Sequence, residues 1–341
     1  MVGILGYGVY IPRYRLKQED PTKVWGGGAR GEKSVCGTDE DIITMAVEAA
    51  DKAIKHSGID PSKIGSIHMG TSSSPYVEGY LSTIIGETLG LDPGTSMIDY
   101  SGSLNVVATA LLGCTDAING KRISYGLVIG TEDRKTAPGS EGETSFGAGA
   151  AALVVSNDGN IAEVEGINTY STLLTDRWRA VSDGNVSNYF DYRFAREEGY
   201  EKHTIEAAKR LLEKSGKKPS DFTHMVFQQP DLRLPSSLAK KLRANKEQIT
   251  LGTTYPYFGD LGSCSVFVGM AAVLEKAKPD ESILLISYGS GCSSAISILV
   301  KDEIEQKRTN AFPMESYISR KEYIDYTTYL KMTETLQRAP Y

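Results

Sequence analysis

The stretch SMIDYSGSLNVVATALLGC, residues 96–114, has the pattern of a turn that presents a catalytic nucleophile. A short apolar strand leads into a turn of small residues, and a helix rich in Val, Ala and Leu follows. Such a turn directs backbone N–H groups and one side chain at whatever occupies the helix N-terminus. The turn offers Ser101, Ser103 and Leu104, whereas Cys114 comes about three helical turns later. The stretch is therefore either an active site without a thiol or the remnant of one.

Side chains that could do chemistry here also have structural interpretations. Ser103 could act as a nucleophile, but an N-cap of the following helix would have the same sequence context. Cys114 falls in the middle of an apolar helix, so we expect it to be a buried core residue. The histidines are expected on helix surfaces or at strand ends, and none is assigned to catalysis: His56, His68, His203 and His224.

The chain contains two pairs of segments that repeat in the same order. Residues 46–72 and 204–230 each combine an amphipathic helix, a Ser-Gly stop, a Pro-Ser turn and a short strand. A second pair begins with Gly-Ser and runs through an apolar helix to a buried strand, at nearly the same offset. Such self-similarity indicates an internal duplication. The glycines that we expect to pair between the halves are Gly58 with Gly216 and Gly102 with Gly262.

Each half, residues 1–160 and residues 161–341, alternates strand and helix. This alternation predicts mainly parallel sheets with helices packed on their faces. The apolar helices that start near Ser103 and Ser263 have no polar stripe, so we expect them to be buried between two sheets. An α/β fold of five layers, α-β-α-β-α, satisfies this pattern. The glycine-rich stretch around Gly289 is typical of a strand whose backbone approaches another group closely.

Composition excludes several classes of function. The 341 residues carry a net charge of −6, which argues against nucleic acid as the main ligand because phosphates need a basic face. No apolar run of about 18 residues occurs, so no membrane-spanning segment is expected. The N-terminus resembles a first strand rather than a signal peptide. Four scattered cysteines, with no CxxC pair and no His at ligand spacing, predict a cytoplasmic location and no bound metal.

Seven motifs follow one another along nearly the whole chain. They are GILGYGVYIPRYRLKQED, EKSVCGTDEDIITMAVEAA, MGTSSSPY, SFGAGAAALVV, VFQQP, ISYGSGCSS and YIDYTTYLKM. In this order and spacing they resemble the thiolase superfamily and, within it, the archaeal-type 3-hydroxy-3-methylglutaryl-CoA synthases. The resemblance implies the thiolase fold, a five-layer sandwich of two related halves. It also implies a CoA thioester as substrate or ligand, no separate cofactor and a homo-oligomer.

Condensing members of this family need three groups: a thiolate that accepts the acyl group, a His that polarises the second thioester, and an acid–base group. The resemblance places the thiol position on Leu104, or on Ser103 if the match slips by one residue. The His position falls on Gln228 in FQQP, and the Glu position falls on Ser72 in MGTSSSPY. A further Asn position is occupied by Asp260. Every one of these positions departs from the catalytic pattern.

The substituted positions keep alternative interpretations. Gln228 can donate a hydrogen bond to a carbonyl but cannot shuttle protons, so it either binds a ligand or is structural. Asp260 is either a base or the cap of its helix. Cys264, which pairs with Leu104 in the repeat, either lines the site or packs in the core. The resemblance also implies substrate or phosphate contacts from Gly289, Arg30 and Lys33.

Functions from different classes remain open. The first is a non-condensing subunit that keeps the fold for assembly with a catalytic thiolase and a small zinc-bearing OB-fold protein. One such acyltransferase system also has FQQ in place of the His, and this resemblance favours the first function. The second is an acyltransferase or thioester hydrolase that uses Ser103 or another unconventional site. The third is an acyl-CoA-binding sensor.

Overall fold

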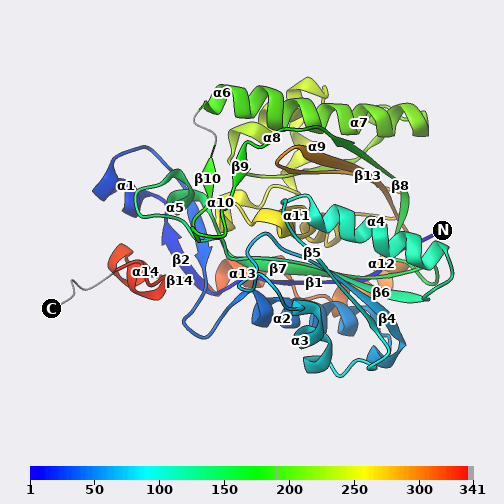
Figure 1. The fold of residues 1–341 in the computed structure, drawn as a ribbon. Helices are drawn as coiled ribbons and strands as arrows, with labels where there is room; N and C mark the ends of the chain where they lie inside the picture. Colours follow the sequence, from blue (N-terminus) through cyan, green and yellow to red (C-terminus); the bar gives the residue numbers. More distant parts are fainter. Residues whose placement is uncertain (189–190, 337–341) are drawn as a thin grey trace.

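The computed structural model describes residues 1–188 and 191–336, and its centre is a mixed sheet of nine strands (Figure 1). The strand order is β11-β12-β13-β8-β1-β7-β6-β4-β5. The strands of the first half are β1 (Gly3–Tyr10), β4 (Ile64–Gly70), β5 (Ser96–Tyr100), β6 (Tyr125–Glu132) and β7 (Gly149–Ser156). Those of the second half are β8 (Ala162–Ser171), β11 (His224–Phe227), β12 (Ser282–Gly289) and β13 (Cys292–Val300).

Apart from β5, which has no counterpart, the strand order is symmetric about the β8–β1 pair. There β1 and β8 pair antiparallel, with Gly3 opposite Glu163 and Ile4 opposite Ala162. On each side follow an antiparallel strand (β7 or β13), then β6 or β12, then a parallel strand (β4 or β11). The prediction of two mainly parallel sheets is therefore corrected. The β1–β8 pairing joins the halves into one sheet, and β7 and β13 each run against both of their neighbours.

Helices cover both outer faces and fill the space between the two halves of the sheet, which confirms the five predicted layers (Figure 1). One outer layer is made by α2 and α3, and the other by α7 and α8. Between them lie α4 and α11, within the largest hydrophobic cluster. These helices are α2 (Ile42–Ser57), α3 (Leu81–Thr88), α4 (Val106–Asn119), α7 (Lys202–Ser215), α8 (Arg233–Lys241) and α11 (Ser265–Leu274).

Smaller elements lie outside the nine-stranded sheet. Strands β2 (Tyr14–Lys17), β3 (Glu32–Val35) and β14 (Glu322–Tyr323) form a separate sheet, and β9 (Arg177–Trp178) pairs with β10 (Ser187–Asn188). The remaining helices are α1 (Glu19–Trp25), α5 (Glu141–Ser145), α6 (Tyr192–Phe194), α9 (Lys246–Thr250), α10 (Tyr255–Phe258), α12 (Glu303–Lys307), α13 (Met314–Ser319) and α14 (Tyr326–Met332). Four of these elements, α5, α6, β9 and β10, contribute residues to the cavity described below. Within residues 1–188 and 191–336, no helix has the length and apolar character needed to cross a membrane.

Local signals in the sequence explain the matching helices α2 and α7. The Asp41 carboxylate accepts hydrogen bonds from the backbone N–H groups of Ile43 and Thr44, which begins α2. Each helix ends at a glycine in the left-handed conformation, with φ of 76° at Gly58 and 70° at Gly216. The two glycines therefore have the same role in the two halves. We propose that the halves meet at residues 160 and 161, directly before β8.

Candidate functional site

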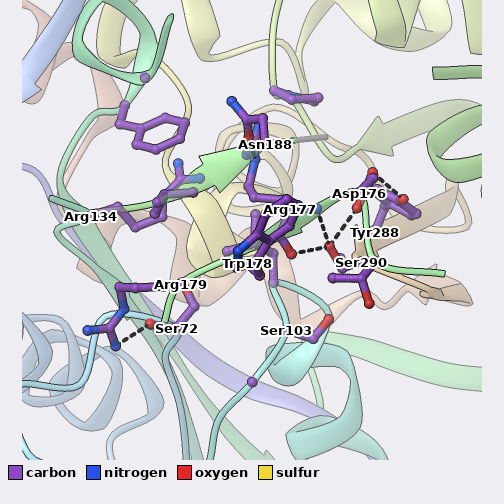
Figure 2. Close-up of a pocket in the computed structure, with 18 of the residues that line it drawn as sticks. Ser72, Ser103, Arg134, Asp176, Arg177, Trp178, Arg179, Asn188, Tyr288 and Ser290 are labelled. Carbon is purple, nitrogen blue, oxygen red and sulfur yellow. Dashed lines mark hydrogen bonds between the residues drawn. The ribbon is translucent and has the colours of Figure 1, made fainter. Parts of the chain in front are cut away.

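A cavity of about 770 Å³ lies where the loops after β4, β5 and β6 meet the end of β12 (Figure 2). The structure brings together in its wall five of the residues singled out in the sequence: Ser72, Ser103, Leu104, Gln228 and Gly289. Because these residues come from both halves of the chain, the cavity is built by the duplication and not by either half alone.

The elbow between β5 and α4 is held by contacts from both halves. Gly102 has φ of 92°, and the Ser103 hydroxyl accepts a hydrogen bond from the Asn105 N–H at 3.2 Å. Asn105, rather than Ser103, is the N-cap of α4. A Cβ on Gly289 would lie 2.3 Å from both Ser103 Oγ and Leu104 N, so only glycine fits there. The end of β12 thus packs directly against the elbow that contains Ser103 and Leu104.

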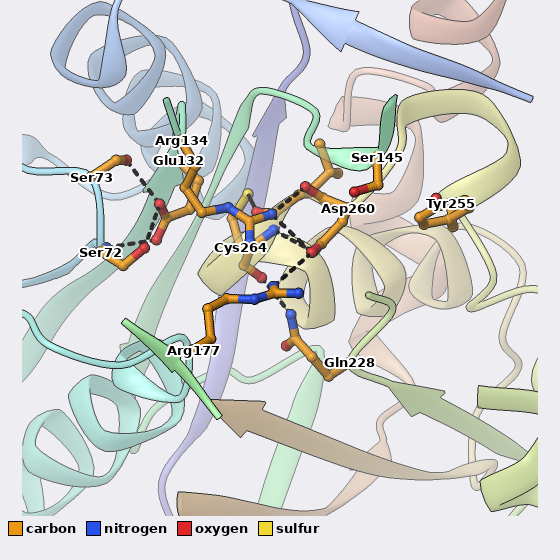
Figure 3. Close-up of polar contacts among 12 residues, drawn as sticks. Ser72, Ser73, Glu132, Arg134, Ser145, Arg177, Gln228, Tyr255, Asp260 and Cys264 are labelled. Carbon is orange, nitrogen blue, oxygen red and sulfur yellow. Dashed lines mark hydrogen bonds and ion pairs between the residues drawn. The ribbon is translucent and has the colours of Figure 1, made fainter. Parts of the chain in front are cut away.

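Ser72 donates hydrogen bonds to the buried carboxylate of Glu132, a residue that the sequence analysis missed. Glu132, at the end of β6, accepts hydrogen bonds from Ser72 N at 2.7 Å, Ser72 Oγ at 3.0 Å and Ser73 Oγ at 2.8 Å (Figure 3). Glu132 is fully buried and does not line the cavity. An acidic residue at the end of an apolar strand is unusual, and this feature of the sequence could have marked Glu132 as a candidate site residue. The proton of the Ser72 hydroxyl is therefore used in the hydrogen bond to Glu132.

Asp260 lies behind the cavity wall, fully buried, and does not line the cavity. Its Oδ2 forms ion pairs with Arg134 Nη2 at 3.0 Å and Arg177 Nη1 at 3.4 Å (Figure 3). Its Oδ1 accepts from the Gly262 N–H at 2.9 Å. A carboxylate enclosed in this way has no access to a substrate proton, so the geometry favours the structural interpretation of Asp260 over the base.

Gln228 is held in the same wall by its own hydrogen bonds. Its Nε2 donates to the Gly262 carbonyl at 2.7 Å, and its backbone carbonyl accepts from the Tyr200 hydroxyl at 2.7 Å. Among the residues that the structure describes, none donates to Gln228 Oε1. One hydrogen of Nε2 is engaged by Gly262 and the amide has a second, so the predicted donation to a substrate carbonyl stays a prediction.

The cysteines lie outside the cavity wall. Cys114 is fully buried in the core, as predicted, and burial raises the pKa of its thiol to about 12. Of the two alternatives for Cys264, the geometry favours packing in the core, because the residue is fully buried and its thiol contacts the Gly149 and Leu261 carbonyls. Burial raises the pKa of Cys264 well above its ordinary value. The structure therefore places Cys264 in the core, not in the site.

The Lys33 side chain is engaged by contacts within the protein. Its side chain is buried, and its ammonium donates to the Tyr329 hydroxyl at 3.0 Å and lies over the Tyr329 ring. Because the Lys33 ammonium is already engaged by Tyr329, the geometry does not favour the implied phosphate contact, which stays a prediction. Arg30 lines a second cavity, of about 840 Å³, beside α1 and α5, and its contact with phosphate stays a prediction.

The four histidines are buried. His224 is the first residue of β11, as expected for a strand end, whereas His56 and His203 lie on the buried faces of α2 and α7 and not on helix surfaces. His68 contacts the Tyr100 hydroxyl at 2.9 Å and the Ser66 hydroxyl at 3.1 Å, and burial lowers its pKa to about 4. Its neutral ring completes the core beneath β5. None of the four histidines lines the cavity.

Several charged residues of the cavity wall escaped the sequence analysis. Asp176 accepts hydrogen bonds from the Tyr288 hydroxyl at 2.6 Å and the Ser290 hydroxyl at 2.5 Å (Figure 2). Burial, and then the Asp176 charge, raise the pKa of Tyr288. Arg179 donates to the Ser72 carbonyl at 3.1 Å, which ties the β9 segment across the cavity. The segment around β9 has no apolar periodicity, so its place in the fold could not be predicted from the sequence. The cluster of charged residues in TDRWR, residues 175–179, was the signal that could have drawn attention to it.

Comparison with known proteins identifies the family. The chain is 39% identical over 335 residues to the hydroxymethylglutaryl-CoA synthase of Pyrococcus furiosus, covering 97% of this chain and 95% of that protein. It is 37% identical over 346 residues to the hydroxymethylglutaryl-CoA synthase of Methanocaldococcus jannaschii, covering 99% and 100%. The chain belongs to the hydroxymethylglutaryl-CoA synthase family. The family model "3-Oxoacyl-[acyl-carrier-protein (ACP)] synthase III C terminal" also matches residues 212–301.

Solved structures show that the fold is that of hydroxymethylglutaryl-CoA synthases. MvaS in complex with 3-hydroxy-3-methylglutaryl coenzyme A matches with a TM-score of 0.88 at 19% identity, covering 100% of this chain and 93% of that one. The 3-oxoacyl-[acyl-carrier-protein] synthase III of Aquifex aeolicus matches with a TM-score of 0.77 at 22% identity, covering 88% and 100%. Both confirm the thiolase-type α/β fold that the motifs implied.

Membership of the hydroxymethylglutaryl-CoA synthase family bears on what this cavity binds. A structure of a hydroxymethylglutaryl-CoA synthase with bound CoA has a TM-score of 0.85 to this chain. CoA is thus a ligand of that hydroxymethylglutaryl-CoA synthase. In this member of the family, the described residues that line the cavity include neither a cysteine nor a histidine.

Proposed function

We propose that this chain binds acyl-CoA thioesters without condensing them, as a subunit of an acyl-transfer complex. The single observation that carries the proposal is the elbow, where Leu104 and Ser103 face the cavity and no thiol does. A condensing mechanism needs a thiolate because it is both a good nucleophile and a good leaving group. Leu104 supplies neither property.

The groups around the elbow support the same conclusion. The hydrogen-bond partner of Ser103 Oγ in the described structure is the Asn105 N–H, which cannot accept its proton. Gln228 does not titrate, and the carboxylates of Glu132 and Asp260 are buried behind the wall. The cavity thus keeps the space for a thioester, but the positions that the resemblance assigns to acid–base catalysis, Gln228 and Ser72, hold neither a His nor a Glu.

A role within a complex is supported by the mouth of the cavity. Tyr76, Val77, Trp178 and Val181 line the cavity and are also exposed, with Val77 at 87% and Val181 at 86%. Clustered apolar side chains on a surface commonly mark protein contacts. We propose a catalytic thiolase and a small zinc-bearing OB-fold protein as partners. The four cysteines are unpaired, which supports a cytoplasmic location for the complex.

A second candidate function is favoured by the placement of Ser103. This hydroxyl lines the cavity two residues before the N-cap of α4, where helix N-terminal N–H groups favour a developing negative charge. An acyltransferase or hydrolase that uses Ser103 would need a base from a residue that moves into contact when substrate binds.

The test of the assembly is purification of the tagged chain from its native source, followed by mass spectrometry of co-purifying proteins and of acylated residues. The proposal predicts a thiolase and a small OB-fold protein in near-stoichiometric amounts, with the acyl group carried by the thiolase. Quadruple replacement of Tyr76, Val77, Trp178 and Val181 by Ser should release the partners. Recovery of the chain alone, with an acyl group on Ser103, would instead support the serine acyltransferase.

A further inference from the structure

The C-terminal segment, residues 322–336, has no part in the proposed function, yet it contacts the wall of the second cavity. Its strand β14 pairs parallel with β2, and its helix α14 lies on the same side of the molecule as α1 and α5 (Figure 1). The Tyr323 hydroxyl donates to the buried Glu32 carboxylate at 2.6 Å, and the buried ring of Tyr329 belongs to a small hydrophobic cluster. The segment is therefore anchored both at β14 and along one face of α14.

The Tyr326 hydroxyl joins two walls of the second cavity. It accepts a hydrogen bond from Trp25 Nε1 at 2.7 Å and donates one to Glu143 Oε1 at 2.8 Å. Trp25 ends α1 and Glu143 lies in α5, and both line the cavity, whereas Tyr326 does not. The Trp25 ring also packs against Gly139, where a Cβ would lie 3.0 Å from the indole. One hydroxyl of α14 therefore holds α1 against α5.

Few buried side chains hold α1 and the glycine-rich loop that follows it. From residue 19 to residue 31, only Pro21 is buried. Gly26 has φ of 82°, and a Cβ there would meet open space. The base of the loop is closed by a hydrogen bond from the Gln18 N–H to the Gly31 carbonyl at 3.0 Å. Segments with few buried contacts and a glycine backbone open locally at low cost, so the contact to Tyr326 decides where the far end of α1 lies.

Glu143 makes the contact to Tyr326 costly to lose. Its side chain is buried, and among the residues that the structure describes it accepts only from Tyr326 and from the Gly139 N–H, at 2.6 Å. A buried carboxylate that loses a donor carries a desolvation penalty larger than the net value of an ordinary hydrogen bond. Water can replace the lost donor only when α1 and α5 separate.

We propose that residues 322–336 form a strap that closes the second cavity, with the Tyr326 hydroxyl as its latch. While the latch is formed, α1 and its glycine-rich loop lie against α5. When it breaks, Trp25 moves away from Gly139 and the cavity widens. The two cavities share wall residues, so the open state also widens the approach to the elbow; the shared residues are Glu141, Ser145, Tyr192, Pro230 and Asp231. This inference does not depend on whether the ligand is a thioester.

The fluorescence of Trp25 reports on the latch directly, because the chain has two tryptophans and the other is Trp178. In a Trp178→Phe background, time-resolved fluorescence anisotropy should show faster local motion of the Trp25 indole once Tyr326→Phe is added. Tyr323→Phe is the matched control, because it removes a hydroxyl of the same segment that donates to Glu32 instead. It should leave the motion of Trp25 unchanged. Unchanged motion in Tyr326→Phe, or an equal increase in both variants, would overturn the latch.

Amide hydrogen exchange measures the movement of α1 itself. Tyr326→Phe should speed exchange in residues 19–31 about fivefold, the size expected for one lost hydrogen bond, and leave α2 unchanged. Trp25→Phe should also speed exchange there, and the double variant should be no faster than Tyr326→Phe, because both changes break the same contact. Additive effects, or equal acceleration in α2, would overturn the proposal. Should Tyr326→Phe not fold, unchanged exchange of residues 19–31 in Trp25→Phe would overturn it as well.

Discussion

At the scale of the residue, the polar groups around the elbow are bonded to one another rather than positioned for proton transfer. Ser72 donates to Glu132, and Gln228 donates to the Gly262 carbonyl. Asp260 is enclosed by Arg134 and Arg177. In a condensing enzyme the side chains at these positions would exchange protons with the substrate. Here Ser72, Gln228 and Asp260 instead form hydrogen bonds or ion pairs within the protein that stabilise the cavity wall. This is the physical basis for proposing that the chain does not condense its ligands.

The sequence could indicate which residue types stand at the elbow but not what they contact. Leu104, Ser103 and Gln228 follow from motifs that are local in the chain, and the structure brings them to one cavity. The enclosure of Asp260 could not be predicted, because Arg134 and Arg177 lie far from it in the sequence and neither sits in a recognisable motif.

Alkylation of the thiols tests the burial of Cys114 and Cys264. Iodoacetamide reacts with thiolates, and burial raises the pKa of Cys114 to about 12 and that of Cys264 well above its ordinary value. In the folded protein near neutral pH, peptide mass spectrometry should find both unlabelled while the half-buried Cys292 is labelled first. In urea all should react. Rapid labelling of folded Cys264 would show that this residue does reach the cavity.

His68 should make the protein less stable in mild acid. Because burial lowers its folded-state pKa to about 4, the unfolded chain takes up a proton at its ordinary pKa of 6.5, before the folded protein does. Stability is thus fully present above about pH 6.5 and is lost progressively as the pH falls toward 4. Urea unfolding of the wild type and His68→Gln across this window should show a shallower pH dependence for the variant. An equal slope for both proteins would contradict the burial of a neutral His68.

At the scale of the element, the two halves repeat the same helix ending. The period of the apolar residues and the Ser-Gly stops predicted α2 and α7 because these signals are local. The antiparallel course of β7 and β13, and the pairing of β1 with β8, could not be predicted. Strand direction and register depend on partners that are distant in the chain, and short apolar runs do not specify them.

The terminal glycines of these helices should contribute equally to stability. Gly58 and Gly216 have φ near +70°, a conformation in which an added Cβ costs about 1 kcal/mol. Gly58→Ala and Gly216→Ala should each lower the free energy of unfolding by about that amount in urea titrations. Gly28→Ala is the matched control, because a Cβ at Gly28 would meet open space and its φ is not left-handed. Unequal costs at Gly58 and Gly216 would contradict the matching of the halves.

At the scale of the whole molecule, the nine-stranded sheet ends in an unpaired edge. Within the described structure, β5 pairs with β4 on one side only, and its residues are partly exposed. An exposed edge strand is a template for pairing with another chain. We therefore predict a homodimer in which β5 of each copy pairs across a twofold axis, close to the elbow that follows β5.

Sedimentation measures this association directly. The account predicts a species of twice the 37.0 kDa chain mass that persists on dilution to micromolar concentration. Replacing Ile98 by Pro should shift the population toward monomer, because proline removes a backbone donor from β5. Circular dichroism of the variant would show whether the fold survives. A wild-type protein that stays monomeric at these concentrations would contradict the dimer.

The measurement that tests the central claim most directly is condensation of acetyl-CoA with acetoacetyl-CoA by the purified chain, followed through CoA release and product mass. The synthase of Pyrococcus furiosus serves as the positive control. The account predicts no turnover by the wild type or by Ser103→Ala, and at most slow self-acylation of Leu104→Cys. A restored thiol still lacks the acid–base groups, which typically contribute roughly 10²–10⁴-fold. Sustained wild-type turnover that Ser103→Ala abolishes would contradict the account and establish a serine enzyme.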